Sequence, residues 1–178
     1  MRIIGGMLKG IRLQPPANLP VRPTTDMAKE ALFNILNNRF DFETCSVLDL
    51  FCGTGNLTFE FASREAERIL AIDMDYGCVN WVKTTATKYD FKQIEVRKGD
   101  VFKLLKQMTG SYDLIFADPP YNMPNIPQIP VMVEDQKLLK PGGLLVVEHQ
   151  SNMKLNSQPG YKETRKYGNS SFSFFEFI

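Results

Sequence analysis

The sequence predicts an α/β fold with a doubly wound, mostly parallel sheet of seven strands and an antiparallel C-terminal hairpin. From residue 46 onward, short apolar runs alternate with segments of helical periodicity. Strands that alternate with helices form right-handed βαβ units, and such units build parallel sheets. Two strand-like runs joined by Gly168 and Asn169 end the chain, and this pattern is typical of a closing hairpin.

The composition is that of one soluble globular domain, because 43% of the 178 residues are apolar and 23% are charged. No apolar run approaches the roughly 18 residues of a membrane span, and the N-terminus lacks the apolar core of a signal peptide. We therefore expect a cytoplasmic protein without a membrane partner. Three cysteines without a C-x-x-C spacing and a single histidine argue against a disulfide framework and a metal site.

Residues 1–40 are expected to form a basic extension ahead of a main domain at residues 41–178. Arg2–Gly6 and Gly10–Gln14 have the pattern of two short strands in a β-hairpin. A helix follows from Thr25 or Asp26, either of which can cap it. Acidic residues are absent before Asp26, so the basic residues of this segment could contact phosphates: Arg2, Lys9, Arg12 and Arg22.

The main domain has the pattern of five alternating strands followed by the hairpin. Each of these strands is a short apolar run bounded by turn residues. The strands are expected at Val47–Phe51, Arg68–Asp73, Ile94–Val96, Tyr112–Ala117 and Leu144–Glu148, with hairpin strands at Lys162–Tyr167 and Phe172–Phe177. Helices are expected at Asn56–Ser63, at Tyr76–Tyr89 and around Leu104, and a tight turn at Pro141–Gly143. This arrangement is Rossmann-like.

Aspartates stand at or just past the ends of four predicted strands, namely Asp49, Asp73, Asp100 and Asp118. In open α/β sheets, ligands bind in a crevice outside the carboxyl ends of the strands. A carboxylate in such a crevice is costly unless it is paired or meets a donor of a ligand. The four aspartates therefore predict one shared ligand site.

A glycine loop, Gly53-Thr54-Gly55, lies between the first strand of the main domain and the next helix. Glycine lets the backbone approach a ligand closely. The dinucleotide fingerprint G-x-G-x-x-G would place a third glycine at position 58, where this chain has Thr58. Asp73 stands where a ribose-binding acid is expected. The loop thus indicates a nucleoside cofactor and leaves NAD and S-adenosylmethionine both open.

The segment Asp118-Pro119-Pro120-Tyr121 favours amine methylation. The exocyclic amine of a nucleobase is a poor nucleophile, because its lone pair is delocalised into the ring. A carboxylate that accepts its N–H stabilises the positive charge that develops during alkylation. The ring of Tyr121 can stack on a base taken out of its stack. Whether Asp118 acts as a general base or only as a hydrogen-bond acceptor stays open.

Val47–Gly55 and Asp118–Tyr121 together resemble the class I S-adenosylmethionine-dependent amino-methyltransferases. Within them, the chain is similar to the bacterial family that methylates guanine N2 in 16S ribosomal RNA. This closer resemblance depends on Met1–Gly6, Arg22–Asp26 and Tyr167–Asn169. Two residues depart from the family pattern, which commonly has a basic residue in place of Met27 and glycine or alanine near Thr58.

The resemblance implies S-adenosylmethionine as the cofactor, no metal, and small-subunit ribosomal RNA, free or in the assembling particle, as the partner. The implied cofactor-binding residues are Asp49, Phe51, Gly53, Gly55, Asp73, Met74, Asp100 and Val101. The implied catalytic and base-binding residues are Asp118, Pro119, Pro120 and Tyr121. The implied contacts with the RNA backbone are Arg2, Lys9, Arg12 and Arg22.

Three other functions compete with this interpretation. An adenine-N6 methyltransferase acting on DNA or RNA would share the motif at Asp118, although the chain has little room for a separate DNA-recognition domain. An NAD-dependent oxidoreductase is disfavoured by Thr58 and has no chemical need for that motif. A non-catalytic RNA-binding protein is disfavoured by the intact glycine loop. His149 and Trp81 are expected to be structural.

Overall fold

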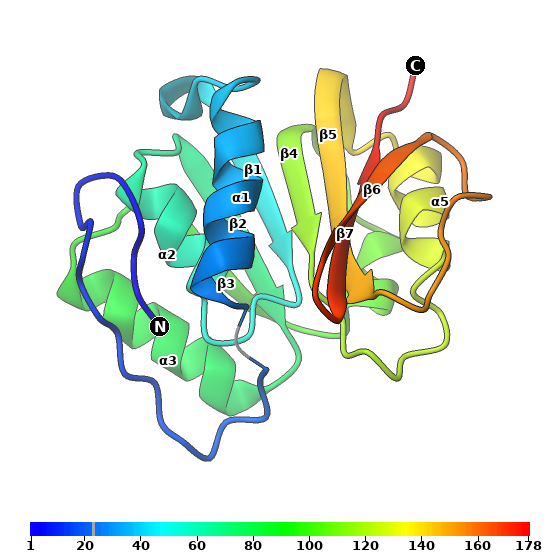
Figure 1. Ribbon diagram of the computed structural model, residues 1–178. Coiled ribbons are helices and arrows are strands. Elements are labelled where there is room, and N and C mark those ends of the chain that lie inside the picture. The colour runs from blue at the N-terminus through cyan, green and yellow to red at the C-terminus, as the bar shows by residue number, and fades with distance from the viewer. Residues whose placement is uncertain (23) are drawn as a thin grey trace.

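The computed structural model describes residues 1–22 and 24–178, so Pro23 of the family segment Arg22–Asp26 lies outside the described residues. The strands are β1 Ser46–Leu50, β2 Arg68–Asp73, β3 Ile94–Lys98, β4 Tyr112–Ala117, β5 Leu139–Gln150, β6 Tyr161–Tyr167 and β7 Ser170–Phe175. They form one seven-stranded sheet in the order β3-β2-β1-β4-β5-β7-β6 (Figure 1). Strands β1 to β5 are parallel, whereas β7 is antiparallel to β5 and β6. The predicted fold class is confirmed.

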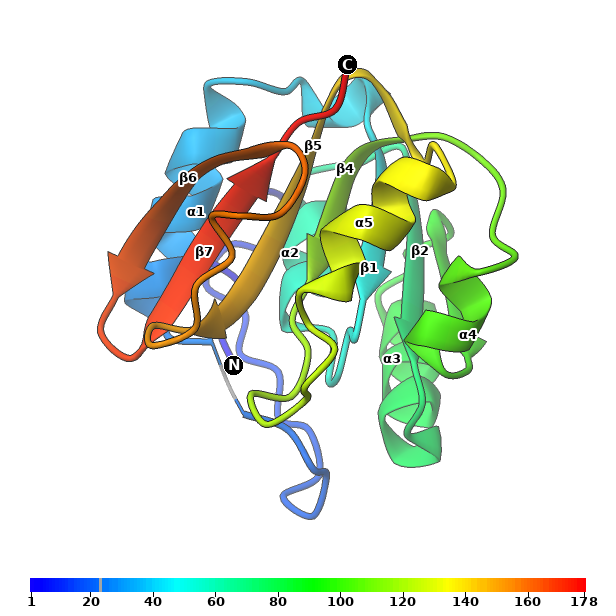
Figure 2. The same cartoon turned by 90° about the vertical axis from the view of Figure 1, so that its right-hand side faces the viewer.

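Helices cover both faces of the sheet, as Figure 2 shows for α1 and α5 on its opposite sides. The helices are α1 Asp26–Asn37, α2 Asn56–Ser63, α3 Tyr76–Lys88, α4 Val101–Leu105 and α5 Gln128–Asp135, with a short 3-10 turn at Phe42–Thr44. Val47 belongs to the core beneath α1, α2 and α3, and its neighbour Leu48 belongs to the core beneath α4 and α5. Successive residues of a strand point to opposite faces, so each parallel strand is apolar throughout.

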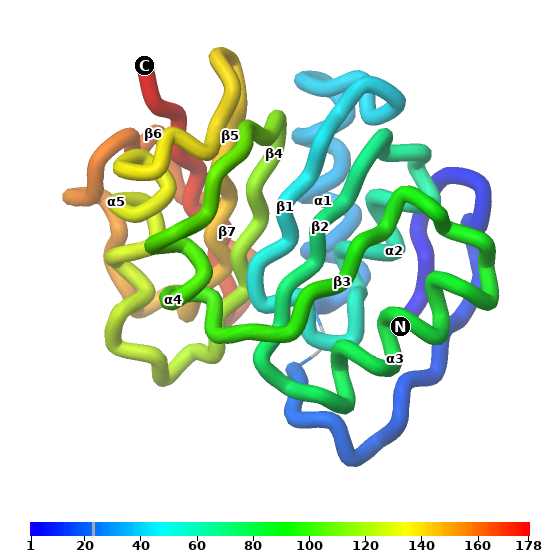
Figure 3. Tube along the Cα trace, turned by 180° about the vertical axis from the view of Figure 1, so that it is seen from behind, coloured from blue at the N-terminus to red at the C-terminus, as the bar shows by residue number. Residues whose placement is uncertain are grey.

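The strand order reverses beside β1. The chain adds β2 and β3 on one side of β1 and then returns to add β4 and β5 on the other, as the view from behind in Figure 3 shows. Such a switch point opens a crevice at the carboxyl ends of the two adjacent strands. These strands are β1 and β4, which carry Asp49 and lead into Asp118.

The N-terminal hairpin contains less strand structure than the sequence predicts. Arg2 and Arg12 form a single isolated antiparallel bridge in place of two strands. The backbone N–H groups of Ile4 and Gly5 donate to the Glu60 carboxylate on α2, both at 2.9 Å. Those donors are used by a side chain, so they cannot continue a strand ladder.

A buried ion cluster joins this N-terminal segment to α1 and α2. Lys29 Nζ lies 3.0 Å from Glu60 Oε1, and both side chains are at most 1% exposed. Arg64 Nε donates to the other oxygen of Glu60 at 2.8 Å. Lys29 also donates to the backbone carbonyl of Arg2 at 2.6 Å and to Asn56 at 2.9 Å. Asn56 is the first residue of α2, directly after the glycine loop, so the cluster positions that loop.

A domain boundary near residue 40 stays a prediction.

Strand β5 begins earlier than the sequence predicts. Tyr112 of β4 pairs with Leu139, but Leu114 pairs with Leu144, so the extra residues of β5 are accommodated in an irregularity of the ladder. The turn predicted around Pro141 is therefore an irregularity inside a strand. Proline lacks the N–H group of a regular ladder and is tolerated at such bulges.

Candidate active site

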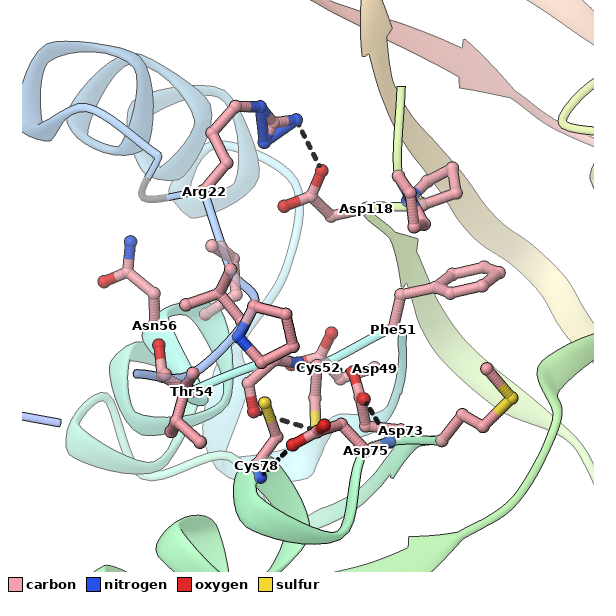
Figure 4. Close-up of a pocket in the computed structure, with 18 of the residues that line it drawn as sticks. Arg22, Asp49, Phe51, Cys52, Thr54, Asn56, Asp73, Asp75, Cys78 and Asp118 are labelled. Atoms are coloured by element: carbon pink, nitrogen blue, oxygen red, sulfur yellow. Dashed lines mark hydrogen bonds and ion pairs between the residues drawn. The ribbon is translucent and has the colours of Figure 1, made fainter. Parts of the chain in front are cut away.

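A cavity of about 940 Å³ lies at the switch point (Figure 4). The catalytic and base-binding residues predicted at Asp118–Tyr121 all line it. Most of the predicted cofactor residues line it as well: Asp49, Phe51, Gly53, Asp73, Met74, Asp100 and Val101. The structure thus brings both predicted groups into one cavity. The individual roles of these residues stay predictions.

The glycine loop turns sharply between β1 and α2. Phe51, Gly53 and Gly55 have φ angles of 60°, 56° and 81°, in the left-handed region that favours glycine. A Cβ atom on Gly55 would lie 2.8 Å from the ring of Phe59, so the loop packs closely against its own helix. Gly55 does not line the cavity, and its contribution is to the shape of the loop. Phe51 holds a strained conformation that is common at functional sites.

Asp49 lines the cavity and is 1% exposed. Thr58, one turn into α2, donates its hydroxyl to Asp49 Oδ2 at 2.5 Å. Burial raises the pKa of Asp49 to about 7, while the Thr58 hydrogen bond lowers it and the charge of Asp73 raises it. In the sequence, Thr58 stands only where a glycine of the cofactor motif is missing. The structure shows instead that it is the hydrogen-bonding partner of a predicted cofactor residue.

Asp73 and Asp100 both hold the backbone around the cavity. Asp73 accepts one hydrogen bond at each carboxylate oxygen, from the N–H of Gly53 at 2.8 Å and that of Asp75 at 2.9 Å. Asp100 caps α4 by accepting from the N–H of Lys103 at 3.1 Å. These hydrogen bonds fix both side chains in place. Each carboxylate oxygen has a second lone pair, so both residues can still accept a hydrogen bond from a ligand.

The other end of the cavity contains Asp118, Tyr121 and Arg22. Arg22 Nη2 lies 3.1 Å from Asp118 Oδ1, as the dashed line in Figure 4 shows. The guanidinium carbon lies 3.6 Å from the centroid of the Tyr121 ring. Arg22 was expected to contact the RNA backbone together with Arg2, Lys9 and Arg12, but of these four only Arg22 lines the cavity.

Glu148, which was not selected from the sequence, lies beside this end of the site and lines an adjoining cavity together with Arg22 and Tyr121. It lies near the end of β5, is 1% exposed, and accepts from Arg22 Nη2 at 3.0 Å and from the Thr24 hydroxyl at 3.2 Å. Burial, together with the negative charge of Glu148, raises the pKa of Asp118 well above its ordinary value, while Arg22 opposes this rise. Glu148 stands near the end of a predicted strand, as the four aspartates do, and this position could have identified it from the sequence.

The two residues expected to be structural make internal contacts. His149 is buried, and its Nε2 lies 2.7 Å from the Ser173 hydroxyl on β7. Trp81 donates its indole N–H to the carbonyl of Thr54 at 3.0 Å and so supports the glycine loop. Among the described residues there is no group of three or more His, Cys, Asp or Glu that could hold a metal. The same residues include no helix with the length and hydropathy needed to cross a membrane.

Comparison with known proteins decides the family. The model of the family described as "Conserved hypothetical protein 95" matches residues 1–176. The chain belongs to this family. Ribosomal RNA small subunit methyltransferase D of Haemophilus influenzae is 32% identical over 159 residues, which cover 87% of this chain and 81% of that protein. The family resemblance found in the sequence is confirmed.

Solved structures of other proteins confirm the fold of this family member. A hypothetical protein of Thermus thermophilus superposes with a TM-score of 0.85 at 27% identity, over 99% of both chains. A Thermus thermophilus 16S rRNA N2 methyltransferase in complex with AdoMet and guanosine superposes with a TM-score of 0.73 over 99% of this chain and 49% of that one. At 22% identity, this second likeness shows the fold alone. The fold is that of the class I methyltransferases.

Proposed function

We propose that this protein transfers the methyl group of S-adenosylmethionine to the exocyclic N2 amine of a guanine in small-subunit ribosomal RNA. The observation that carries the proposal is the position of Asp118. It lies directly after β4, in the same cavity as the glycine loop and Asp73. Membership of a family that includes small-subunit rRNA methyltransferases supports the RNA substrate.

The residues of the cavity fit the proposed cofactor. A cavity of about 940 Å³ falls within the range of roughly 300–1,000 Å³ typical of ligand sites. Asp49 would accept from the amino group of the methionine part, Asp73 from the ribose hydroxyls and Asp100 from the adenine amine. When bound, S-adenosylmethionine supplies an electrophilic methyl group on a sulfonium. Three carboxyl groups around one cavity suit this positively charged ligand, because each provides acceptors and, when ionised, negative charge.

At the acceptor end, the protein orients the amine and receives its proton. Asp118 and the carbonyl of Pro119 would accept the two N–H bonds of the amine, and the ring of Tyr121 would stack on the base. A carboxylate beside the nitrogen stabilises the positive charge that develops there as the new N–C bond forms. The raised pKa of Asp118 makes it a better acceptor for the proton released after transfer.

The basic N-terminal segment is the proposed contact with the RNA backbone. Lys9 and Arg12 are exposed there, while Arg2 is partly engaged with Asp26 at 3.0 Å. Electrostatic contacts with phosphates are independent of sequence and weaken with salt. The segment would therefore hold the RNA while the cavity selects the base, in free RNA or in the assembling particle.

The first experiment measures label transfer from S-adenosylmethionine to small-subunit RNA, both free and assembled, followed by identification of the methylated nucleoside. N2-methylguanosine supports the proposal. N6-methyladenine as the product would assign the protein to the adenine-N6 methyltransferases. A lack of methyl transfer to either form of the RNA would contradict the proposal. A comparison of free and assembled RNA also determines which form is the substrate.

Replacing Asp118 with alanine should abolish transfer and leave cofactor affinity near that of the wild type. The physical reason is that Asp118 touches the target amine, whereas the proposed cofactor contacts come from other strands. Asp135→Ala, an exposed position on α5, is the matched control and should retain full activity. Retained transfer in the Asp118 variant would refute its assigned role.

A further inference from the structure

Two carboxylates at the acceptor end share one nitrogen of a guanidinium group. Arg22 Nη2 lies 3.1 Å from Asp118 Oδ1 and 3.0 Å from Glu148 Oε2. The two acceptor oxygens are therefore no more than about 6 Å apart, while the guanidinium carbon lies 3.6 Å from the centroid of the Tyr121 ring. The group thus stacks on an aromatic ring and donates to two acids at its edge.

This arrangement has the chemistry of a bound guanine edge. In guanine, N1–H and the N2 amine are attached to one carbon that also carries N3, so this edge is itself a planar guanidine fragment. The guanidinium of Arg22 stacks on Tyr121 and faces both carboxylates, as this edge would, although Arg22 reaches both acids from the single nitrogen Nη2 whereas guanine would use N1 for one acid and N2 for the other. Arg22 is 38% exposed, and its long side chain can leave toward solvent when a base enters.

Glu148 is a buried acid that needs such a donor. Its side chain is 1% exposed, and in the described part of the chain Arg22 is its only cationic partner. The Thr24 hydroxyl donates to the other oxygen at 3.2 Å and fixes the direction of the carboxylate. A buried charge that loses its partner is costly, so the group that replaces Arg22 must donate an N–H to Glu148.

We infer that Glu148 is a specificity-determining residue that accepts the N1–H of the target guanine while Asp118 accepts from its N2 amine. This inference rests on the proposed function. Adenine and cytosine present a lone pair, at N1 and N3 respectively, beside their exocyclic amine. A carboxylate facing that lone pair is repelled by it and is left without a donor. The pair of acids therefore selects guanine. When no base is bound, the guanidinium of Arg22 occupies the position of the guanine edge.

The test compares guanine with 2-aminopurine, which retains the N2 amine but carries a lone pair at N1. Both bases are placed at the methylated position of the shortest small-subunit RNA fragment that the wild type modifies. The kcat/KM for methyl transfer is measured for the wild type and for Glu148→Gln. The wild type should prefer guanine by about 10-fold or more, since a buried acceptor left unpaired is strongly discriminated against. The glutamine amide can donate to the N1 lone pair, so the preference should shrink to within about threefold.

Two further variants separate this role from a structural one. Glu148→Asp keeps the charge but withdraws it by one methylene, so it should lower the rate on guanine without improving the relative rate on 2-aminopurine. Glu163→Gln, at an exposed position on β6, should leave both rates unchanged. If Glu148→Gln does not fold, an unchanged guanine preference in Glu148→Asp at full activity overturns the inference.

The failures of the two proposals are distinguishable. A wild type that forms no N2-methylguanosine in the guanine RNA refutes the proposed function and this inference together. A wild type that forms it, with a Glu148→Gln variant that loses activity equally on both bases, refutes only the role of Glu148. A Glu148→Gln variant that narrows the preference supports both.

Discussion

Replacing Asp49 with asparagine should remove a large part of the pH dependence of the free energy of unfolding between pH 5 and pH 8. Asp49 is 1% exposed, and burial raises its pKa from 3.8 to about 7. Between these two values the folded protein holds a proton that the unfolded chain has released. The stability of the folded state is therefore highest below pH 4 with respect to this group and is lost as the pH rises through 7.

The size of the effect follows from the two pKa values. One pKa unit corresponds to about 1.4 kcal/mol. The ionisation of Asp49 therefore lowers the free energy of unfolding by about 4 kcal/mol in total once the pH is above 7. Part of this free-energy change has already occurred by pH 5, because the aspartate of the unfolded chain ionises near pH 4. The contribution of Asp49 to the free energy of unfolding should thus fall by about 2–3 kcal/mol between pH 5 and pH 8. Asparagine has the same shape and can still accept from the Thr58 hydroxyl, but it does not titrate.

The assay is urea unfolding of the wild type and of Asp49→Asn at several pH values, without cofactor. Asp118 also has a raised pKa and contributes to the wild-type slope in the same direction, so the difference between the two proteins reports the titration of Asp49 together with its effect on the pKa of Asp118. Asp113→Asn is the control, because contacts with Ser46 and Lys140 outweigh partial burial and lower the pKa of Asp113. Its removal should leave the slope between pH 5 and pH 8 unchanged. Parallel curves for the wild type and Asp49→Asn would refute the reasoning.

Two further predictions concern the cofactor end and the buried ion cluster. Thr58→Val removes the hydrogen bond that lowers the pKa of Asp49, so less of Asp49 is ionised at pH 7 and S-adenosylmethionine binding should weaken about 10-fold or more, the loss expected for a hydrogen bond to a charged group. Calorimetry should show that the deficit shrinks at pH 9, where more of Asp49 is ionised in both proteins than at pH 7; a pH-independent deficit would contradict this. Glu60→Gln leaves Lys29 buried without a counter-charge and should lower the free energy of unfolding by about 3–5 kcal/mol. An unchanged denaturation midpoint in that variant would show that the cluster does not stabilise the N-terminal segment.

The pattern of the sequence was sufficient for the sheet and for one side of the site. Buried parallel strands are continuous apolar runs, and their carboxyl ends meet at one edge of the sheet. For that reason Asp49, Asp73, Asp100 and Asp118 could be placed in one crevice from the sequence alone. The glycine loop was equally readable, since a turn between a strand and a helix has a local signature.

The partners of these residues were decided by the tertiary structure. Arg22 is separated by 96 residues from Asp118 and by 126 from Glu148, and a basic residue in an acid-free segment has the local pattern of a surface contact. Thr58 broke a glycine motif in the sequence, yet the orientation of α2 turns its hydroxyl toward Asp49. Sequence spacing determines which strand end carries an acid. Only the packing of distant segments determines which hydrogen-bond donor each acid meets, and that donor controls its charge and its direction.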